Sequence, residues 1–418
     1  MEHQLLYLFL ACGFGLFMTW GVGANDLANV MSTTMGSKAV SVRTAVIIAV
    51  VFEIAGAFLG GSAVSDTLRH EIINLDYIAQ HHEPLLLIEG MLAVLMAGMT
   101  WMGLASFLGF PVSITNAIVG SIVGFGVVVV GMDGVHWQEV SLIALSWISS
   151  PVVAGIVAFI LFRSIQVLML SKRDPLANAI KYLPYYFFLV GMVLSYITVF
   201  KALQHLGIDY GKRIDLLICS LVGLLTVFLG KLATRQFIPE TRLRRRDAFI
   251  QIENMFAVLM GLTACAMVFA HGANDVSVAV GPITVVFSMV MHGDLATLST
   301  GFPAWITLLG VVGVLTGLIT YGKKVIETVG SRITALTPSR AFAATISAAT
   351  AVVISTSIGL PVSTTQTLVG SVLGVGLARG IGALNTSVIR NIFMSWVITL
   401  PAASLLTIVF FNILKRWL

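Results

Sequence analysis

Long apolar stretches recur along the whole chain, each close to the ~20 residues that cross a bilayer as a helix. Hydrophobic residues make up 57% of the 418 residues and charged residues only 10%, whereas soluble domains carry about 25% charged residues. The pattern therefore predicts an all-α, polytopic membrane protein with about 12 transmembrane helices. The predicted spans are 4–36, 42–62, 85–103, 105–131, 139–163, 182–204, 213–231, 248–291, 302–322, 340–358, 360–378 and 388–414.

Two of these spans, 4–36 and 248–291, are too long for one straight transmembrane helix. Both carry polar, glycine-rich interruptions. Glycine permits a helix to break, and a break inside a membrane is tolerated where the backbone lines a cavity. We therefore expect broken or re-entrant helices in this fold.

Lysine and arginine are distributed unevenly between the two sides of the predicted topology. With successive loops on alternating sides, 18 of the 24 basic residues fall on one side. Because Lys and Arg are enriched in cytoplasmic loops, both termini are predicted to face outward. These loops account for the net charge of +5, so no nucleic-acid partner is expected. The apolar N-terminal stretch lacks the basic start of a signal peptide and is expected to remain as the first helix.

The chain repeats itself at a separation of about half its length. Residues 23–26 (Gly-Ala-Asn-Asp) recur as residues 272–275, and residues 105–126 match residues 355–376 at ten of 22 positions. Each copy holds five spans and two spans separate them, so the second copy enters the membrane from the opposite side. Inverted repeats of this kind build a shared site near the bilayer midplane. The predicted units are 1–165 (first repeat), 166–247 (connector with two helices and a basic cytoplasmic loop) and 248–418 (second repeat).

Carboxylates and amides stand inside the apolar spans of both repeats. A charged side chain in a membrane is costly, and it usually lines a cavity, pairs with a partner or is protonated. The alternative, a hydrogen bond that only packs helices together, is less favoured because the Asn-Asp pair is duplicated. We predict a coupling-ion site for Na⁺ or H⁺, with Asp26 and Asp275 as the Na⁺ ligands if sodium drives the cycle. The residues of this predicted site are Asn25, Asp26, Asn29, Asp275 and Glu53.

A second duplicated element reads Pro-Val-Ser-x-Thr-Asn/Gln, and each copy follows a glycine (Gly109 or Gly359) at an expected re-entrant turn. Proline suits the first turn of a helix, where unsatisfied N–H groups and the positive end of the helix dipole favour an anion. Ordinary N-capping is the alternative for a single copy, but two copies favour an anion site. The predicted anion ligands are Ser113, Thr115, Asn116, Ser363, Thr364, Thr365 and Gln366.

Together the two kinds of element predict a coupled anion site. Hydroxyls and helix N-termini attract an anion, and the aspartates repel it until a cation or a proton neutralises them. Phosphate near neutral pH keeps a proton that a carboxylate can accept, whereas sulfate does not, which favours phosphate. A permease for sulfate or a related oxyanion remains the alternative. An anion channel is disfavoured because buried carboxylates hinder a passive anion pore.

No enzyme motif is present in the chain. GxSxG, HExxH and Walker A sequences are all missing, so we expect a transporter that draws on an ion gradient, with no enzymatic activity and no cofactor. His271 lies just before the second Asn-Asp pair. We expect it to pack at the edge of the site, in preference to acting as a ligand or a proton relay.

Residues 23–29 (Gly-Ala-Asn-Asp-Leu-Ala-Asn) and 272–276 (Gly-Ala-Asn-Asp-Val) give the chain a resemblance to the inorganic phosphate transporter (PiT) family. The duplicated Pro-Val-Ser segments fit that family too, and the resemblance covers nearly the whole chain. It implies a twelve-helix inverted-repeat fold with hairpin-like broken segments, a homodimer, and cotransport of inorganic phosphate with Na⁺ or H⁺.

The chain departs from the family pattern at one place and suggests a source at another. In the second motif, Ser277 and Val278 stand where the family often has Ala-Asn, so one side-chain amide is missing. The connector lacks the large hydrophilic loop of animal members, and the chain resembles a bacterial form, which implies the bacterial inner membrane. The phosphate and coupling-ion candidates that the resemblance implies are Asp26, Asn274, Asp275, Ser113, Thr115, Asn116, Ser363, Thr364, Thr365 and Gln366.

Overall fold

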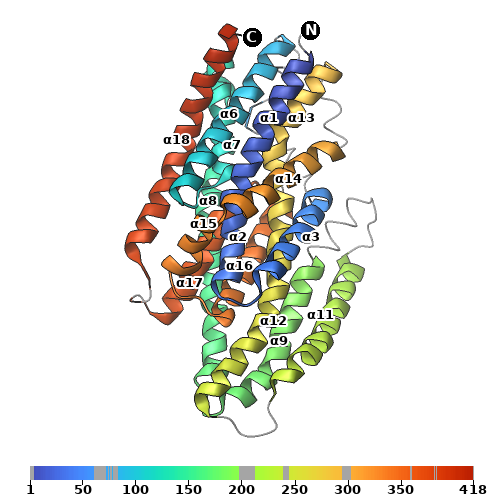
Figure 1. Ribbon diagram of the computed structural model, residues 1–418, viewed down its shortest axis with the longest axis vertical. Coiled ribbons are helices and arrows are strands. Elements are labelled where there is room, and N and C mark those ends of the chain that lie inside the picture. Colours follow the sequence, from blue (N-terminus) through green and yellow to red (C-terminus); the bar gives the residue numbers. More distant parts are fainter. Residues whose placement is uncertain are drawn as a thin grey trace.

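A computed structural model describes residues 4–60, 83–196, 212–238, 244–293, 303–357, 360–380 and 384–417, with Ile72, Ile73, Leu75, Ile78 and Gly382. The regular elements of these residues are all helical (Figure 1). The α-helices are α1 (Gln4–Val22), α2 (Ala28–Gly36), α3 (Val42–Gly60), α6 (Pro84–Leu108), α7 (Ile114–Val129), α8 (Trp137–Ile165), α9 (Pro175–Ser195), α11 (Lys212–Thr234), α12 (Arg245–His271), α13 (Ser277–Met291), α14 (Ala304–Tyr321), α15 (Lys323–Glu327), α16 (Pro338–Ser357), α17 (Thr364–Arg379) and α18 (Thr386–Trp417). The π-helical turns are η1 (Gly23–Leu27), η3 (Gln166–Leu170), η6 (Gly272–Val276) and η8 (Thr328–Arg332), and the 3-10 turns are η2 (Met132–Gly134) and η5 (Arg235–Phe237).

Ten long helices and two short ones follow the order of the twelve predicted spans. Ten helices of the described ranges are long and apolar enough to cross a membrane. The other two, α7 and α17, have 16 residues each. At 1.5 Å per residue they reach about 24 Å, less than the ~30 Å hydrocarbon core. The predicted spans 105–131 and 360–378 are thereby corrected: each contains a turn and a helix too short to cross the bilayer.

The two short helices are the return arms of re-entrant hairpins. α7 runs back along α6, so that Gly90 near the start of α6 lies against the ring of Phe125 near the end of α7. Gly109 closes α6 in the left-handed conformation (φ 74°), which glycine adopts without strain. In the second repeat Arg379, at the end of α17, donates a hydrogen bond to Thr334 just before α16 (2.8 Å). Gly359, the predicted counterpart of Gly109, lies outside the described residues.

The first and eighth spans were expected to break at their glycine-rich motifs, and the structure differs. Both stay helical and pass through the motif as a π-turn, η1 in one repeat and η6 in the other. A π-turn widens the helix by one residue while keeping backbone hydrogen bonds, and such turns are frequent at functional sites. Keeping those bonds avoids the cost of unpaired backbone groups inside a membrane.

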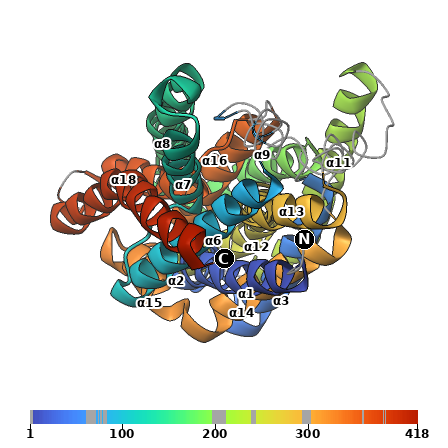
Figure 2. The same cartoon turned by 90° about the horizontal axis from the view of Figure 1, so that it is seen from above.

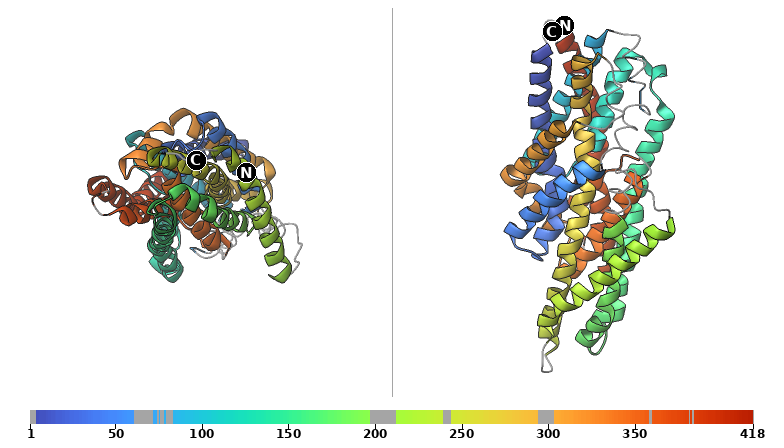
Figure 3. Two further views of the ribbon diagram at one scale, coloured as in Figure 1. Left: turned by 90° about the horizontal axis from the view of Figure 1, so that it is seen from below. Right: turned by 90° about the vertical axis from the view of Figure 1, so that its right-hand side faces the viewer.

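The two repeats run in opposite directions through the molecule. α1 begins at the top of Figure 1 and continues downward into α2, whereas α12 begins at the bottom and continues upward into α13. Both chain termini lie at the same end, as the further views also show (Figure 3). Seen from above, α8, α11 and α18 lie at the periphery, while α6 and α12 lie nearer the middle (Figure 2). The inverted arrangement predicted from the repeat is thus present in the fold.

Each re-entrant hairpin is held by the last long helix of the other repeat. α8 packs along α17, and α18 packs along α7. The indole N–H of Trp147 in α8 donates to the carbonyl of Pro361 (3.3 Å), and that of Trp396 in α18 donates to the carbonyl of Pro111 (3.1 Å). Both prolines lie in the hairpin turns. Each repeat therefore donates an indole hydrogen bond to the hairpin turn of the other repeat.

The α8–α17 contact predicts a strict requirement for glycine. A Cβ on Gly374 would lie 2.0 Å from the carbonyl oxygen of Gly155, so the helices would have to separate. We expect Gly374→Ala to destabilise the protein by about 1–3 kcal/mol, as overpacked sites do. Thermal unfolding of the purified protein in detergent measures this. Gly103→Ala in α6 is the matched control, because a Cβ there has no neighbour within 4 Å. Equal melting temperatures for the two variants would contradict the packing described.

Candidate functional site

The site is built where the π-turns meet the tips of the re-entrant hairpins. In the first repeat, the Asn25 amide donates to the carbonyl of Phe110 (2.9 Å) and accepts from the N–H of Val112 (3.0 Å). A turn inside a membrane leaves backbone groups that only the protein can satisfy. Asn25 meets this need with both ends of its side chain, so the asparagine fixes the turn against η1.

In the second repeat, the equivalent residue Asn274 also binds the turn of its hairpin. Its amide donates to the carbonyl of Val362 (2.8 Å), while its oxygen lies 3.5 Å from the Thr356 hydroxyl. The same Val362 carbonyl also accepts from the hydroxyl of Thr115 at the start of α7 (3.3 Å). The tips of the two hairpins therefore touch, and the two π-turns anchor them from either side.

Asp26 joins the N-termini of both short helices. One carboxylate oxygen accepts from the N–H of Ile114 in the first turn of α7 (3.1 Å). The other accepts from the hydroxyl of Thr365 in the first turn of α17. Helix N-termini carry partial positive charge, which stabilises an adjacent carboxylate. Asp26 is 1% exposed, so this interaction is not weakened by water.

Asp275 occupies the mirrored position. Its carboxylate accepts from the hydroxyl of Thr364 and from the amide of Asn274 (2.5 Å). The hydroxyls that bind Asp275 and Asp26 belong to Thr364 and Thr365, which are adjacent in the first turn of α17. The two acidic residues of the sequence motif thus share one buried region between the helix N-termini, as predicted.

The serines of the duplicated segment cap the short helices. The Ser113 oxygen accepts from the N–H of Asn116 (3.3 Å), and the Ser363 oxygen accepts from the N–H of Gln366 (3.1 Å). These contacts are the N-capping that the sequence left open as an alternative. They do not exclude the anion role, because a hydroxyl that accepts a bond still has its own proton to donate.

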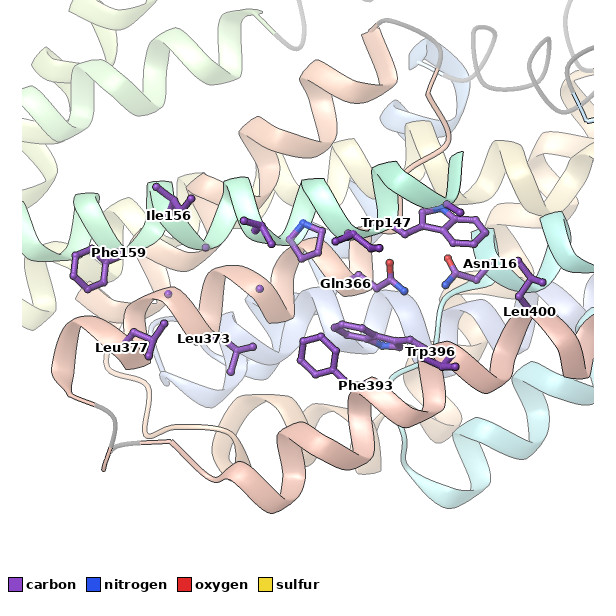
Figure 4. Close-up of a pocket in the computed structure, with 18 of the residues that line it drawn as sticks. Asn116, Trp147, Ile156, Phe159, Gln366, Leu373, Leu377, Phe393, Trp396 and Leu400 are labelled. Atoms are coloured by element: carbon purple, nitrogen blue, oxygen red, sulfur yellow. The ribbon is translucent and has the colours of Figure 1, made fainter. Parts of the chain in front are cut away.

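Two amides and two indoles are among the residues that line a cavity of about 830 Å³ along α8, α17 and α18 (Figure 4), whose wall includes the exposed Ile148 and Ile156. Asn116 and Gln366 lie side by side between Trp147 and Trp396. Both amides are buried, and the oxygens Oδ1 of Asn116 and Oε1 of Gln366 have no hydrogen-bond partner within the described part of the chain. Buried polar groups without partners mark a place where a ligand or water is bound. The rest of the cavity is mostly apolar, including Ile148, Val152, Ile156, Phe159, Leu373, Leu377, Phe393 and Leu400.

Asn29 lies one turn beyond Asp26 and is fully buried. Its amide nitrogen lies 3.4 Å from the backbone carbonyl of Thr365. The hydroxyl of the same threonine binds Asp26. The Asn29 Oδ1 has no hydrogen-bond partner among the residues that the structure describes. A carboxylate and an unpaired amide oxygen near one backbone carbonyl are the oxygen ligands that hard cations prefer.

His271 is the residue that the sequence interpretation missed. Its Nδ1 lies 2.7 Å from Glu53 Oε1 on α3, and its Nε2 lies 3.1 Å from Asp275 Oδ2. All three side chains are fully buried, so His271 does more than pack: Nδ1 is hydrogen-bonded to Glu53, whereas Nε2 approaches Asp275 without the geometry of a hydrogen bond. The signal available in the sequence was the spacing: residues four apart on a helix face one another, which places His271 beside Asp275. Its second partner, Glu53, comes from a distant span that spacing could not identify.

Comparisons with known proteins agree with this architecture. Residues 22–407 match the model of the Phosphate transporter family. The chain is 43% identical to the "Putative phosphate permease" of Haemophilus influenzae, covering 96% of this chain and 95% of that protein. It is 35% identical to the "Inorganic phosphate transporter 2-1, chloroplastic" of Arabidopsis thaliana, covering 95% of this chain and 70% of that protein. The solved structure of "The sodium-dependent phosphate transporter" superposes with a TM-score of 0.88 at 35% identity, covering 99% of this chain and 100% of that one. The chain therefore belongs to the phosphate transporter family.

Proposed function

We propose that this protein is a symporter that moves inorganic phosphate across the membrane together with Na⁺ or H⁺. One observation carries the proposal: the N-termini of α7 and α17 meet beside two buried carboxylates, Asp26 and Asp275. Helix N-termini and hydroxyls attract an oxyanion without a formal positive charge. The carboxylates then make binding of that anion depend on a neutralising cation or proton.

The phosphate ligands that we propose surround these N-termini. Neutral donors can wrap a tetrahedral anion, and they can release it because no fixed cation holds it. A phosphate that still carries a proton can donate it to a carboxylate, which gives phosphate an advantage over sulfate. A sulfate permease is the alternative function. The proposed ligands are Ser113, Thr115, Asn116, Asn274, Ser363, Thr364, Thr365 and Gln366.

Na⁺ is the coupling ion that the residues fit best. The Asp26 carboxylate and the unpaired Oδ1 of Asn29 are buried oxygen ligands in one region. The solved relative is named as sodium-dependent, which supports the same choice. When bound, Na⁺ would offset the negative charge that opposes phosphate. Asn25, Asp275 and Glu53 complete the set of coupling residues that we propose.

We also propose that the protein acts in the bacterial inner membrane, as a homodimer, with both termini outside. The excess of Lys and Arg on one side of the topology supports this orientation. The short connector, from 166 to 247, supports the bacterial assignment.

Uptake into proteoliposomes tests the function directly. We expect labelled phosphate to accumulate when an inward Na⁺ gradient is imposed and external sulfate to compete poorly. A pH gradient imposed without Na⁺ separates proton coupling from sodium coupling. Phosphate uptake that ignores both gradients would show that the protein is not a symporter, and sulfate uptake in place of phosphate would establish the alternative.

Removing the charge of Asp26 should stop coupled transport. We expect Asp26→Asn to lower initial phosphate uptake by at least about tenfold, since an intramembrane carboxylate is retained for function. Asp133→Asn is the control, because Asp133 is exposed in η2. Size-exclusion profiles of both variants check that insertion and folding are intact. Uptake at the wild-type rate in a well-folded Asp26→Asn protein would remove Asp26 from the mechanism.

The amide of Gln366 should contribute to phosphate affinity. We expect Gln366→Leu to raise the half-saturation concentration for phosphate about tenfold, equivalent to ~1.4 kcal/mol of binding. Gln236→Leu, at an exposed position of η5, provides the comparison. An unchanged half-saturation concentration in Gln366→Leu, measured at saturating Na⁺, would place phosphate away from this amide.

A further inference from the structure

Another cavity lies outside the candidate phosphate site, where the two connector helices meet the second repeat. It has a volume of about 190 Å³ and lies between α9, α11 and α12. Figure 1 places α9, α11 and the first part of α12 at the end of the molecule away from both termini. Because we propose that the termini lie outside, this end is the cytoplasmic one.

Two basic side chains line this cavity, Lys231 in the last turn of α11 and Arg235 in η5. Both are exposed, and neither side chain forms a hydrogen bond or an ion pair with the residues that the structure describes. Basic residues are favourable at the C-terminus of any helix, but these two also flank a cavity whose described lining holds no acidic residue. Their charge is therefore available to an anionic ligand.

The rest of the cavity wall is mostly apolar. Leu183, Phe187 and Met255 form its buried part. Ile180 and Ile238 are exposed, so the wall continues to the outer surface of the protein. Free phosphate gains nothing from such side chains, whereas the apolar part of a lipid is stabilised by them. The lining therefore favours an anion that carries an apolar group.

The exposed face of α11 extends this apolar surface away from the cavity. Leu217, Leu221, Leu224 and Phe228 lie 14, 10, 7 and 3 residues before Lys231, which is the spacing of one helix face. All four are exposed. A phosphate group beside Lys231 would thus leave its acyl chains in contact with an apolar stripe along the membrane.

Pro184 adds a hydrogen-bond acceptor to the cavity. Proline has no N–H, so the Ile180 carbonyl, four residues earlier in α9, lacks its usual helical donor. Both residues line the cavity. A headgroup with hydroxyls, such as that of phosphatidylglycerol, can donate to this carbonyl while its phosphate accepts from the basic side chains.

We propose that this cavity binds the phosphate group of one anionic phospholipid from the cytoplasmic leaflet, with its acyl chains along α11. Basic pockets between transmembrane helices on the cytoplasmic side suit anionic headgroups. α11 packs mainly on α9, so a lipid that also touches α12 fastens the connector to the second repeat. The inference goes beyond the proposed transport function and uses only its membrane orientation.

Native mass spectrometry of the full-length protein tests this by counting retained lipids. We expect one phosphatidylglycerol per chain and at least about tenfold weaker retention of phosphatidylcholine, which has no net charge. The double variant Lys231→Gln and Arg235→Gln should bind phosphatidylglycerol about thirtyfold more weakly, equivalent to ~2 kcal/mol. The control pair Lys323→Gln and Arg390→Gln removes the same charge from exposed positions of α15 and α18 and should bind like the wild type.

Melting temperatures of the same samples provide a second readout. Phosphatidylglycerol should raise the melting temperature of the wild type and of the control pair, but not of the Lys231 and Arg235 double variant. Inorganic phosphate, the free form of the same ligand group, should change the melting temperature equally in all three proteins. A phosphate effect that is lost only in this double variant would overturn the inference and assign the cavity to free phosphate.

Three further results would also overturn the inference. Equal retention of the two lipids would show that charge does not select the ligand. Wild-type lipid binding in the Lys231 and Arg235 double variant would place the lipid elsewhere. A change from dimer to monomer in this variant without added lipid would assign the surface to a second copy of the chain.

Discussion

Everything in this fold depends on satisfying backbone polar groups where two hairpins turn inside the membrane. A lipid environment offers no hydrogen bonds, so each turn must find its partners within the protein. Asn25 and Asn274 supply amide groups to the turns, and Trp147 and Trp396 supply indole N–H groups. These four side chains come in equivalent pairs, one from each repeat. The hairpin tips, and with them the N-termini of α7 and α17, are placed by these bonds.

Placing two helix N-termini together concentrates positive potential without introducing a basic side chain. Asp26 and Asp275 use part of that potential, because each accepts bonds from the first turns of the short helices or their hydroxyls. Anion and carboxylate therefore compete for the same donors. A cation that binds Asp26 relieves the competition, which is the physical basis that we propose for coupling. The loss of a single buried hydroxyl or amide should therefore alter the competition between the anion and the carboxylates for these donors.

Much of this arrangement could be predicted from the sequence, because periodic apolar spans and duplicated polar motifs survive in the primary structure. The spans, their order, the inversion and the association of Asp26 with Asp275 all follow from those patterns. The half-length of α7 and α17 could not be predicted, because the stretches 105–131 and 360–378 are each close to the ~20 residues that cross a bilayer as a helix. Nor could the π-turns, since glycine-rich sequence is compatible with either a break or a widened turn. The contact of His271 with Glu53 depends on how α3 packs against α12, which no local pattern encodes.

The exchange of hairpin supports between repeats has a consequence for how the chain is made. α7 is synthesised early, but the helix that packs along it, α18, follows all the other described helices in the sequence. Until α18 is inserted, the apolar flank of the first hairpin faces lipid and the Pro111 carbonyl lacks its indole donor. Maturation of the early half therefore depends on the later insertion of α18. A chain that stops before α18 would keep an unfinished first half-site, with the hairpin turn at Pro111 missing the indole of Trp396.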